Sequence, residues 1–185
     1  MIGESLLTSK NPYLEYIPMN AEYDKVASDL KRSLKCEDIC ISVLLRVKNP
    51  ALEAEFQHTA AAITEKRGGK VPEIVDVYHG TTMDSAESIA EKGFDPAYSK
   101  VAAYGKGTYA SPSAKMALGY CKDVKERSDF SMLFKCKFLK GKYGATANGS
   151  HIDTAVADYS GSGEILVTPY KNGILPEYLI CYYKW

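Results

Sequence analysis

Apolar residues recur along this chain with two different periods, and each period predicts its own kind of element. Where they return every three or four positions, as at Tyr23, Val26, Leu30 and Leu34, they form one face of a helix. This spacing predicts helices over Glu22–Leu34 and Asp84–Lys92. It predicts a further helix between them that ends just before Gly68, with Leu52, Phe56, Ala60 and Ile63 on its apolar face. Short apolar runs predict strands over Ile39–Val47, Ile74–His79, Met132–Leu139, Ile165–Thr168 and Glu177–Tyr183.

Two stretches carry no such pattern and are predicted to be loops. Phe94–Gly107 has no clear period, and Gly141–Gly163 is rich in glycine, serine and alanine. Between these stretches, Ser113–Cys121 is predicted to form a short helix. There is no internal repeat, so the mixture of helices and strands predicts one α+β domain, a size that 185 residues fit.

Charge and cysteine content narrow the class of protein. The 23 acidic residues balance the 23 basic ones, and no dense run of Lys or Arg is present, so no nucleic-acid partner is expected. No leader pattern and no long apolar stretch occurs, so we expect no membrane partner and a cytoplasmic or nuclear protein. The five cysteines are consistent with reduced thiols. Cys36 and Cys40 lack a second pair of ligands, so no metal site is predicted.

The most informative residues are a histidine and a glycine at the end of the strand over Ile74–His79. Without a Cβ, Gly80 can bring its backbone N–H and C=O close to a planar ligand, while His79 offers one donor and one acceptor beside them. Thirty residues later, two glycines precede Tyr109, and Tyr120 follows in the next predicted helix. Two such rings can sandwich a flat heterocycle. The combination suits a carboxamide and a ribose hydroxyl, and we expect NAD as the ligand.

The same residues carry a resemblance to a known family. Val77–Thr81 and Tyr104–Ser111 resemble the histidine and tyrosine motifs of poly(ADP-ribose) polymerase-like ADP-ribosyltransferases. Ile41–Phe56 and Ile174–Ile180 resemble the flanking elements of the mono-transferase branch of that family. The resemblance covers Tyr23 to Trp185 and implies the ADP-ribosyltransferase fold, with a mixed or antiparallel two-sheet core and flanking helices. It places the catalytic domain at residues 21–185, after an N-terminal extension of residues 1–20.

The resemblance also implies a role for each residue of the site. His79 would hold a ribose hydroxyl and the nicotinamide amide, and Gly80 would bond the carboxamide through its backbone. Tyr109 and Tyr120 would stack on nicotinamide, and Thr81 belongs to the same NAD-binding motif.

Two positions depart from the polymerase pattern. Counting back from Pro176 without gaps places Ile165 at the third catalytic position, where polymerases have glutamate and many mono-transferases have an aliphatic residue. Glu164 is adjacent, but side chains alternate along a strand, so only a bulge would turn it into the site. Ala117 stands where the family usually has a serine that bonds the nicotinamide amide, and losing that bond costs about 0.5–1.5 kcal/mol.

These features predict an NAD-dependent protein mono-ADP-ribosyltransferase that releases nicotinamide and modifies acceptor proteins, which can include the chain itself. Isoleucine cannot bond the ribose or activate a growing chain, so polymer synthesis is not expected. Two alternatives stay open on the sequence. One is a catalytically silent module that binds NAD or ADP-ribose, and the other is an enzyme similar to RNA 2'-phosphotransferases.

Overall fold

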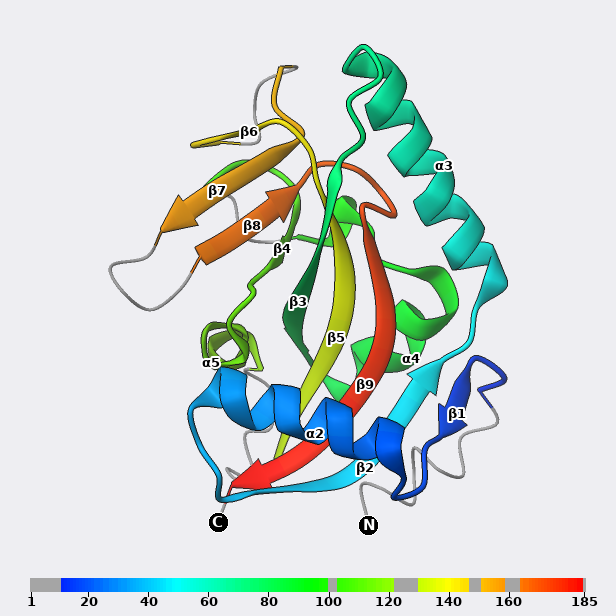
Figure 1. Ribbon diagram of the computed structural model, residues 1–185, viewed down its shortest axis with the longest axis vertical. Coiled ribbons are helices and arrows are strands. Elements are labelled where there is room, and N and C mark those ends of the chain that lie inside the picture. Colours follow the sequence, from blue (N-terminus) through cyan, green and yellow to red (C-terminus); the bar gives the residue numbers. More distant parts are fainter. Residues whose placement is uncertain (1–10, 100–102, 122–129, 147–150, 159–163, 185) are drawn as a thin grey trace.

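A five-stranded sheet forms the centre of the molecule (Figure 1). The computed structural model describes residues 11–99, 103–121, 130–146, 151–158 and 164–184. All neighbouring strands of this sheet are antiparallel. Their spatial order is β1 (Leu14–Tyr16), β2 (Ile39–Val47), β9 (Ile174–Lys184), β5 (Phe130–Lys140) and β3 (Glu73–Thr81). The strand β3 therefore lies at one edge, with its open side available to other elements.

A second, smaller sheet lies beyond that open edge. Its order is β4 (Thr108–Ala110), β8 (Glu164–Thr168), β7 (Thr154–Asp158) and β6 (Tyr143–Gly144), with β6 and β7 parallel and the other pairs antiparallel. An isolated bridge between Tyr78 of β3 and Ser111 joins the two sheets. The predicted fold class, an α+β two-sheet core with flanking helices, is confirmed.

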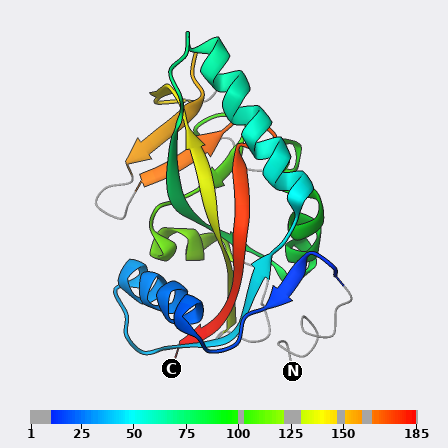
Figure 2. The ribbon, with the colours of Figure 1, turned by 45° about the vertical axis from the view of Figure 1, so that its right-hand side comes forward.

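Helices cover both faces of the large sheet. α2 (Ala21–Leu34) and α3 (Pro50–Lys66) lie on the face turned toward the viewer (Figures 1 and 2), whereas α4 (Met83–Lys92) packs on the other face. α5 (Ala114–Ala117) continues into a short 3-10 turn, η2 (Leu118–Tyr120), and another turn, η1 (Pro96–Tyr98), follows α4. Among the helices in the described ranges, none has the length and apolar content needed to cross a membrane.

The alternation of β5 separates two apolar layers. Phe134, Cys136 and Phe138 are fully buried against α4 and the small sheet. On the opposite face, Leu133 packs beneath α2 and Leu139 beneath α3. This alternation follows from the sequence pattern of the strand, because successive side chains point to opposite faces.

The helix starts are fixed by caps that the hydrophobic pattern does not include. The side chain of Asn20 accepts hydrogen bonds from the N–H groups of Glu22 and Tyr23, which starts α2 at Ala21. The side chain of Asn49 caps α3 in the same way, and Pro50 occupies its first turn.

Two expectations about elements are corrected, and two short strands were missed. The stretch Gly141–Gly163, predicted to be a loop, contains β6 and β7, because Thr154 and Ala155 are small residues that are nevertheless fully buried. The strands β1 and β4 were not predicted, since three residues are too few to show a period. The helix expected over Ser113–Cys121 is one α-helical turn followed by the 3-10 turn.

Candidate active site

A cleft of about 780 Å³ opens where the end of β3, α4 and the start of β4 meet. His79, Thr81 and Tyr109 line it, together with Phe94 after α4 and Lys171 before β9. The motifs that the sequence places thirty residues apart are thus neighbours in space. The volume falls in the range of cavities that hold a cofactor-sized ligand.

The backbone of Gly80 faces the cleft. The N–H and C=O of Tyr78 bond to Ser111, on the side of β3 that points away from β5. β3 pairs with β5 without a register shift through Thr81, so the groups of Gly80, two residues on, point the same way as those of Tyr78. A donor and an acceptor are therefore presented together at the open edge, as a primary carboxamide requires.

Packing explains why this position is glycine. A Cβ added at Gly80 would lie 2.3 Å from the carbonyl oxygen of Ala117 and 2.8 Å from the Sγ of Cys121. The end of α5 and Cys121, the residue after η2, therefore lie directly against Gly80. The missing side chain is needed for this close approach as much as for a ligand.

His79 is held in one tautomer. Its Nδ1 lies 2.7 Å from the carbonyl oxygen of Tyr109, which can only accept, so Nδ1 donates and Nε2 is left as an acceptor. The ring also contacts Phe94 edge to face, with the centroids 4.8 Å apart. Burial lowers the pKa of His79, although the bond to Tyr109 opposes this. The site therefore contains a neutral imidazole at pH 7 that can accept a hydrogen bond from a hydroxyl.

Tyr109 is fixed by the glycine turn that precedes it. Its hydroxyl donates to the carbonyl of Gly105 at 2.8 Å and accepts from the N–H of Tyr104 at 3.1 Å. Gly105 has a φ of 101°, a conformation that favours glycine. Only 8% of Tyr109 is exposed, so this ring is a rigid wall rather than a mobile side chain.

A narrow space shares three lining residues with the cleft, His79, Gly80 and Tyr109, and is called its deep end below. His79, Gly80, Tyr109, Ala117 and Ile165 all border a space of about 10 Å³ there, which is roughly what a single water molecule needs. The half-buried side chain of Met116 borders the same space and packs with the cluster around Tyr109 and Ile165. A planar ring can enter only if a side chain moves, and the unbranched methionine is the most adaptable of the lining side chains.

Ile165 and Glu164 face different environments, as alternation along a strand requires. Ile165 is 4% exposed and packs with Tyr109, whereas Glu164 is exposed. The pairing of β7 with β8 runs without a shift from Asp158–Glu164 to Ala155–Val167. A bulge that would turn Glu164 into the site is therefore not present in this pairing.

Not every residue named from the sequence can be placed. Tyr120 belongs to η2, but its side chain lies outside the described part of the structure. Sequence reasoning did not assign Met116 or Ser111 to the site. Ser111 donates through Oγ to the carbonyl of Glu164 at 2.6 Å and so links β8 to β3. Its place at the end of the tyrosine motif was the available signal.

Comparisons with known proteins give the family of the chain. Residues 20–161 match the family model described as the poly(ADP-ribose) polymerase catalytic domain. This range includes His79 and Tyr109 but ends before Ile165. Over 175 residues the chain is 26% identical to the mouse protein mono-ADP-ribosyltransferase PARP12, and over 176 residues it is 26% identical to the human protein of that name. Each alignment covers 87% of this chain and 24% of the relative, so the chain spans about a quarter of the relatives' length.

Proposed function

Because the chain belongs to the family of poly(ADP-ribose) polymerase catalytic domains, we propose that it is an NAD-dependent protein mono-ADP-ribosyltransferase. The observation that carries the proposal is the convergence of His79, Tyr109 and the outward backbone of Gly80 on one cleft. The proposal also assigns residues 21–185 to the catalytic domain and takes acceptor proteins, which can include the chain itself, as partners.

In this proposal NAD binds with its nicotinamide at the deep end of the cleft. The Nε2 of His79 accepts a hydrogen bond from a hydroxyl of the adjoining ribose, and Gly80 bonds the carboxamide through its N–H and C=O. Tyr109 and Tyr120 enclose the ring, and Thr81 lines the entrance. The adenosine half occupies the wider part of the cleft, beside α4.

The reaction breaks the bond between the anomeric carbon of the ribose and the pyridinium nitrogen of NAD. The electron pair of that bond stays on nitrogen, so nicotinamide leaves as a neutral molecule. A nucleophile of the acceptor protein then forms a bond to the anomeric carbon and, if it carries a proton, releases it to water. The protein lowers the barrier by holding the ribose and the leaving ring in one orientation.

Ile165 limits the product in this proposal. A glutamate at the third position would bond the ribose, stabilise positive charge at the anomeric carbon and activate a hydroxyl for chain growth. An apolar side chain supplies none of these, so the acceptor must be an intrinsically nucleophilic side chain or one that carries its own negative charge. One ADP-ribose unit per acceptor site is the expected product.

The narrow deep end supports a second candidate, a module that binds NAD or ADP-ribose without turnover. A space of about 10 Å³ excludes nicotinamide until Met116 or a neighbour moves. If that movement is not accessible, only the adenosine half would bind. The two candidates differ in one observable, which is covalent ADP-ribose.

Incubation with NAD, followed by intact mass measurement of the chain and of an added protein mixture, tests the proposal. We expect one or a few additions of a single ADP-ribose unit, and no addition with His79→Ala. His58→Ala is the matched control, because His58 lies exposed on α3. Heat with NAD in calorimetry but no added mass would favour the silent module, whereas neither heat nor mass would refute both.

Ile165→Glu tests the third position in the same assay. If residue 165 lies against the reacting ribose, the carboxylate should increase labelling or lengthen the product. Circular dichroism on the same sample checks that the variant is folded. Unchanged labelling by a folded variant would place residue 165 outside the reacting centre.

A further inference from the structure

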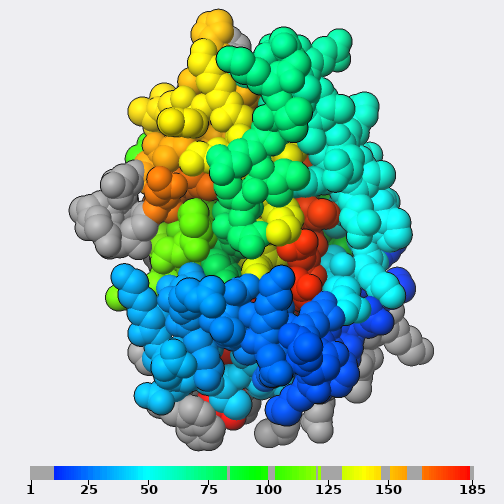
Figure 3. Space-filling model, in the orientation of Figure 1, coloured from blue at the N-terminus to red at the C-terminus, as the bar shows by residue number. Residues whose placement is uncertain are grey.

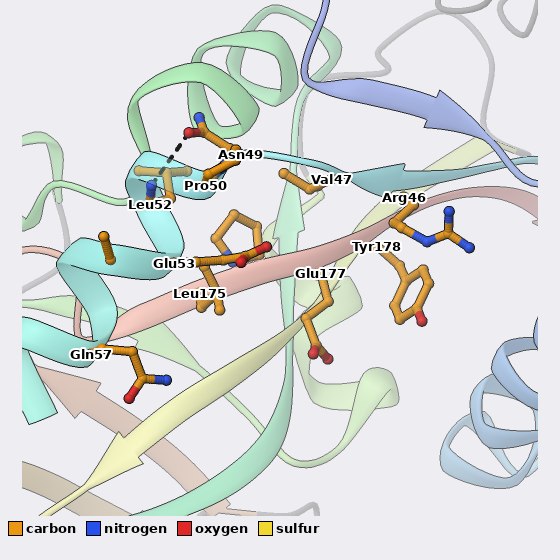
Figure 4. Close-up of a pocket in the computed structure, with 12 residues that line it drawn as sticks. Arg46, Val47, Asn49, Pro50, Leu52, Glu53, Gln57, Leu175, Glu177 and Tyr178 are labelled. Carbon is orange, nitrogen blue, oxygen red and sulfur yellow. Dashed lines mark hydrogen bonds between the residues drawn. The ribbon is translucent and has the colours of Figure 1, made fainter.

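A second groove lies on the face of the large sheet that carries α2 and α3. It runs between α3 and the beginning of β9 and has a volume of about 490 Å³ (Figure 4). A strip of β9 is visible between the two helices in the space-filling view (Figure 3). The groove shares no lining residue with the NAD cleft, so it is a separate feature of the surface.

Apolar residues form part of the groove wall. Leu52, Leu175 and Pro176 all line the groove, where Leu175 is half-buried and the other two expose little surface. Such a wall suits the aliphatic portion of a side chain or the face of an extended peptide.

A β-bulge puts a carboxylate beside this wall. The pairing of β5 with β9 matches Lys135 to Tyr178 and Cys136 to Pro176, so Glu177 is an extra residue without a partner on β5. Bulges often re-aim a side chain, and here the bulged residue lines the groove.

The carboxylate of Glu177 is poorly neutralised. Its side chain is 31% exposed, and the Nζ of Lys137 is 3.8 Å away, whereas the same Nζ lies 2.5 Å from Asp76. Burial raises the pKa of Glu177, against the attraction of Lys137. A partly buried carboxylate that shares its nearest cation with a second, closer carboxylate is only weakly compensated, and an incoming cation would offset that cost.

A second carboxylate borders the groove from the other side. Glu53, on the first turn of α3, extends across the groove toward β9 in the view of Figure 4. It forms no ion pair with any residue in the described ranges. Arg46, at the far end, is committed to Glu15 at 2.7 Å and to Glu22. The end near Glu53 and Glu177 is therefore acidic.

We propose that this groove docks a basic segment of a partner protein. A lysine or arginine side chain places its charge between Glu53 and Glu177, and its aliphatic stem lies along Pro176 and Leu52. The charges favour this occupant over an acidic or phosphorylated one. The inference does not depend on the proposed transfer reaction, because the two sites share no residue.

The probe for a test is a fluorescein-labelled peptide of alternating leucine and arginine, paired with the same peptide carrying neutral citrulline in place of arginine. We expect anisotropy to show saturable binding of the arginine peptide only. Amide shifts of the labelled full chain should map that binding to α3 and β9. The double variant Glu53→Gln and Glu177→Gln should raise Kd about tenfold, since two ion pairs of ordinary strength amount to about one decade.

Glu55→Gln is the matched control, because Glu55 is an exposed carboxylate of α3 that does not line the groove. It should leave Kd unchanged. Equal binding of the citrulline peptide, an unchanged Kd in the double variant with an intact circular dichroism spectrum, or shifts outside α3 and β9 would overturn the proposal. Concentration-dependent shifts at the groove without peptide would also overturn it, by identifying a second copy of the chain as the occupant.

Discussion

Asp153 joins three segments that are distant in the sequence, and its replacement by asparagine should destabilise the fold. Its side chain is fully buried, with Oδ2 2.5 Å from Nε of Arg67 and 2.9 Å from the N–H of Lys142. The other oxygen accepts from Tyr170 at 2.8 Å and from Lys66 at 3.2 Å. The end of α3, the turn before β6 and the turn before β9 all meet at this carboxylate.

The magnitude follows from the pKa of Asp153. Burial alone would raise it, but hydrogen bonds from Arg67, Tyr170, Lys142 and Lys66 outweigh burial and lower the pKa from 3.8 to about 2. That difference corresponds to about 2 kcal/mol of folding free energy. An amide would also turn a donor toward donors, which adds about 1 kcal/mol or more. We therefore expect Asp153→Asn to cost about 2–4 kcal/mol at pH 7.

Urea unfolding followed by circular dichroism measures this cost, and its pH dependence identifies the cause. The folded pKa lies below the unfolded one, so the contribution is complete above about pH 4 and is lost as the pH falls toward about 2. The difference between wild type and variant should shrink over that window. Asp76→Asn is the control, because its ion pair is exposed and should be worth under about 1 kcal/mol. A variant within about 0.5 kcal/mol of wild type at pH 7, or a difference that is constant with pH, would refute the reasoning.

Three further predictions concern the site and the core. Gly80→Ala should lower Tm by about 2–10 °C, as overpacking of about 1–3 kcal/mol implies, and it should weaken NAD binding in calorimetry. Gly119→Ala is the control and should do neither, because nothing lies within 4 Å of its added Cβ. Equal effects of the two variants would contradict the packing argument. An NMR titration of the His79 ring should give a midpoint below the ordinary pKa of 6.5, because burial lowers the pKa of this ring. NAD affinity should decrease when the pH is lowered through that midpoint, because the ring then protonates. A midpoint above 6.5 would exclude a neutral acceptor. Asp29→Asn should cost about 1–3 kcal/mol in urea unfolding, because Lys135, with 8% of its side chain exposed, lies 2.6 Å from Asp29. Adding Lys135→Met should recover most of that loss. No recovery would show that Asp29 acts through other contacts.

Periodicity predicts the fold best where an element is long and has one apolar face. The strand Ile39–Val47 begins and ends where the sequence places it, and the helix expected over Glu22–Leu34 begins one residue earlier. The small sheet was largely missed, because β6 has two residues and β7 has small or polar residues at all positions except Val156. Burial there is imposed by tertiary packing, and intrinsic preference does not reveal it.

The candidate site could be proposed from the sequence where the type of residue itself indicates its chemistry. His79, Gly80 and Tyr109 could be chosen for that reason, and they do line one cleft. The network around Asp153 could not be foreseen, because its partners on α3 are 86 and 87 residues away and no local pattern links them. The narrow deep end was equally hidden, since it depends on how the side chain of Met116 packs.

Ile165 contributes apolar burial at a position where a carboxylate would be costly unless a ligand bonded it. In β8 it packs with Tyr109, Ala157 and Val167 in a small cluster that closes the deep end of the cleft. A carboxylate there would leave water for this apolar cluster, which is favourable only if the ribose of NAD or another donor bonds it. An isoleucine instead contributes apolar burial whether or not a ligand is present. The chain therefore keeps a well-packed cleft without a carboxylate at this position. We expect Ile165→Glu to lose stability in the absence of NAD and to recover part of it when NAD is bound.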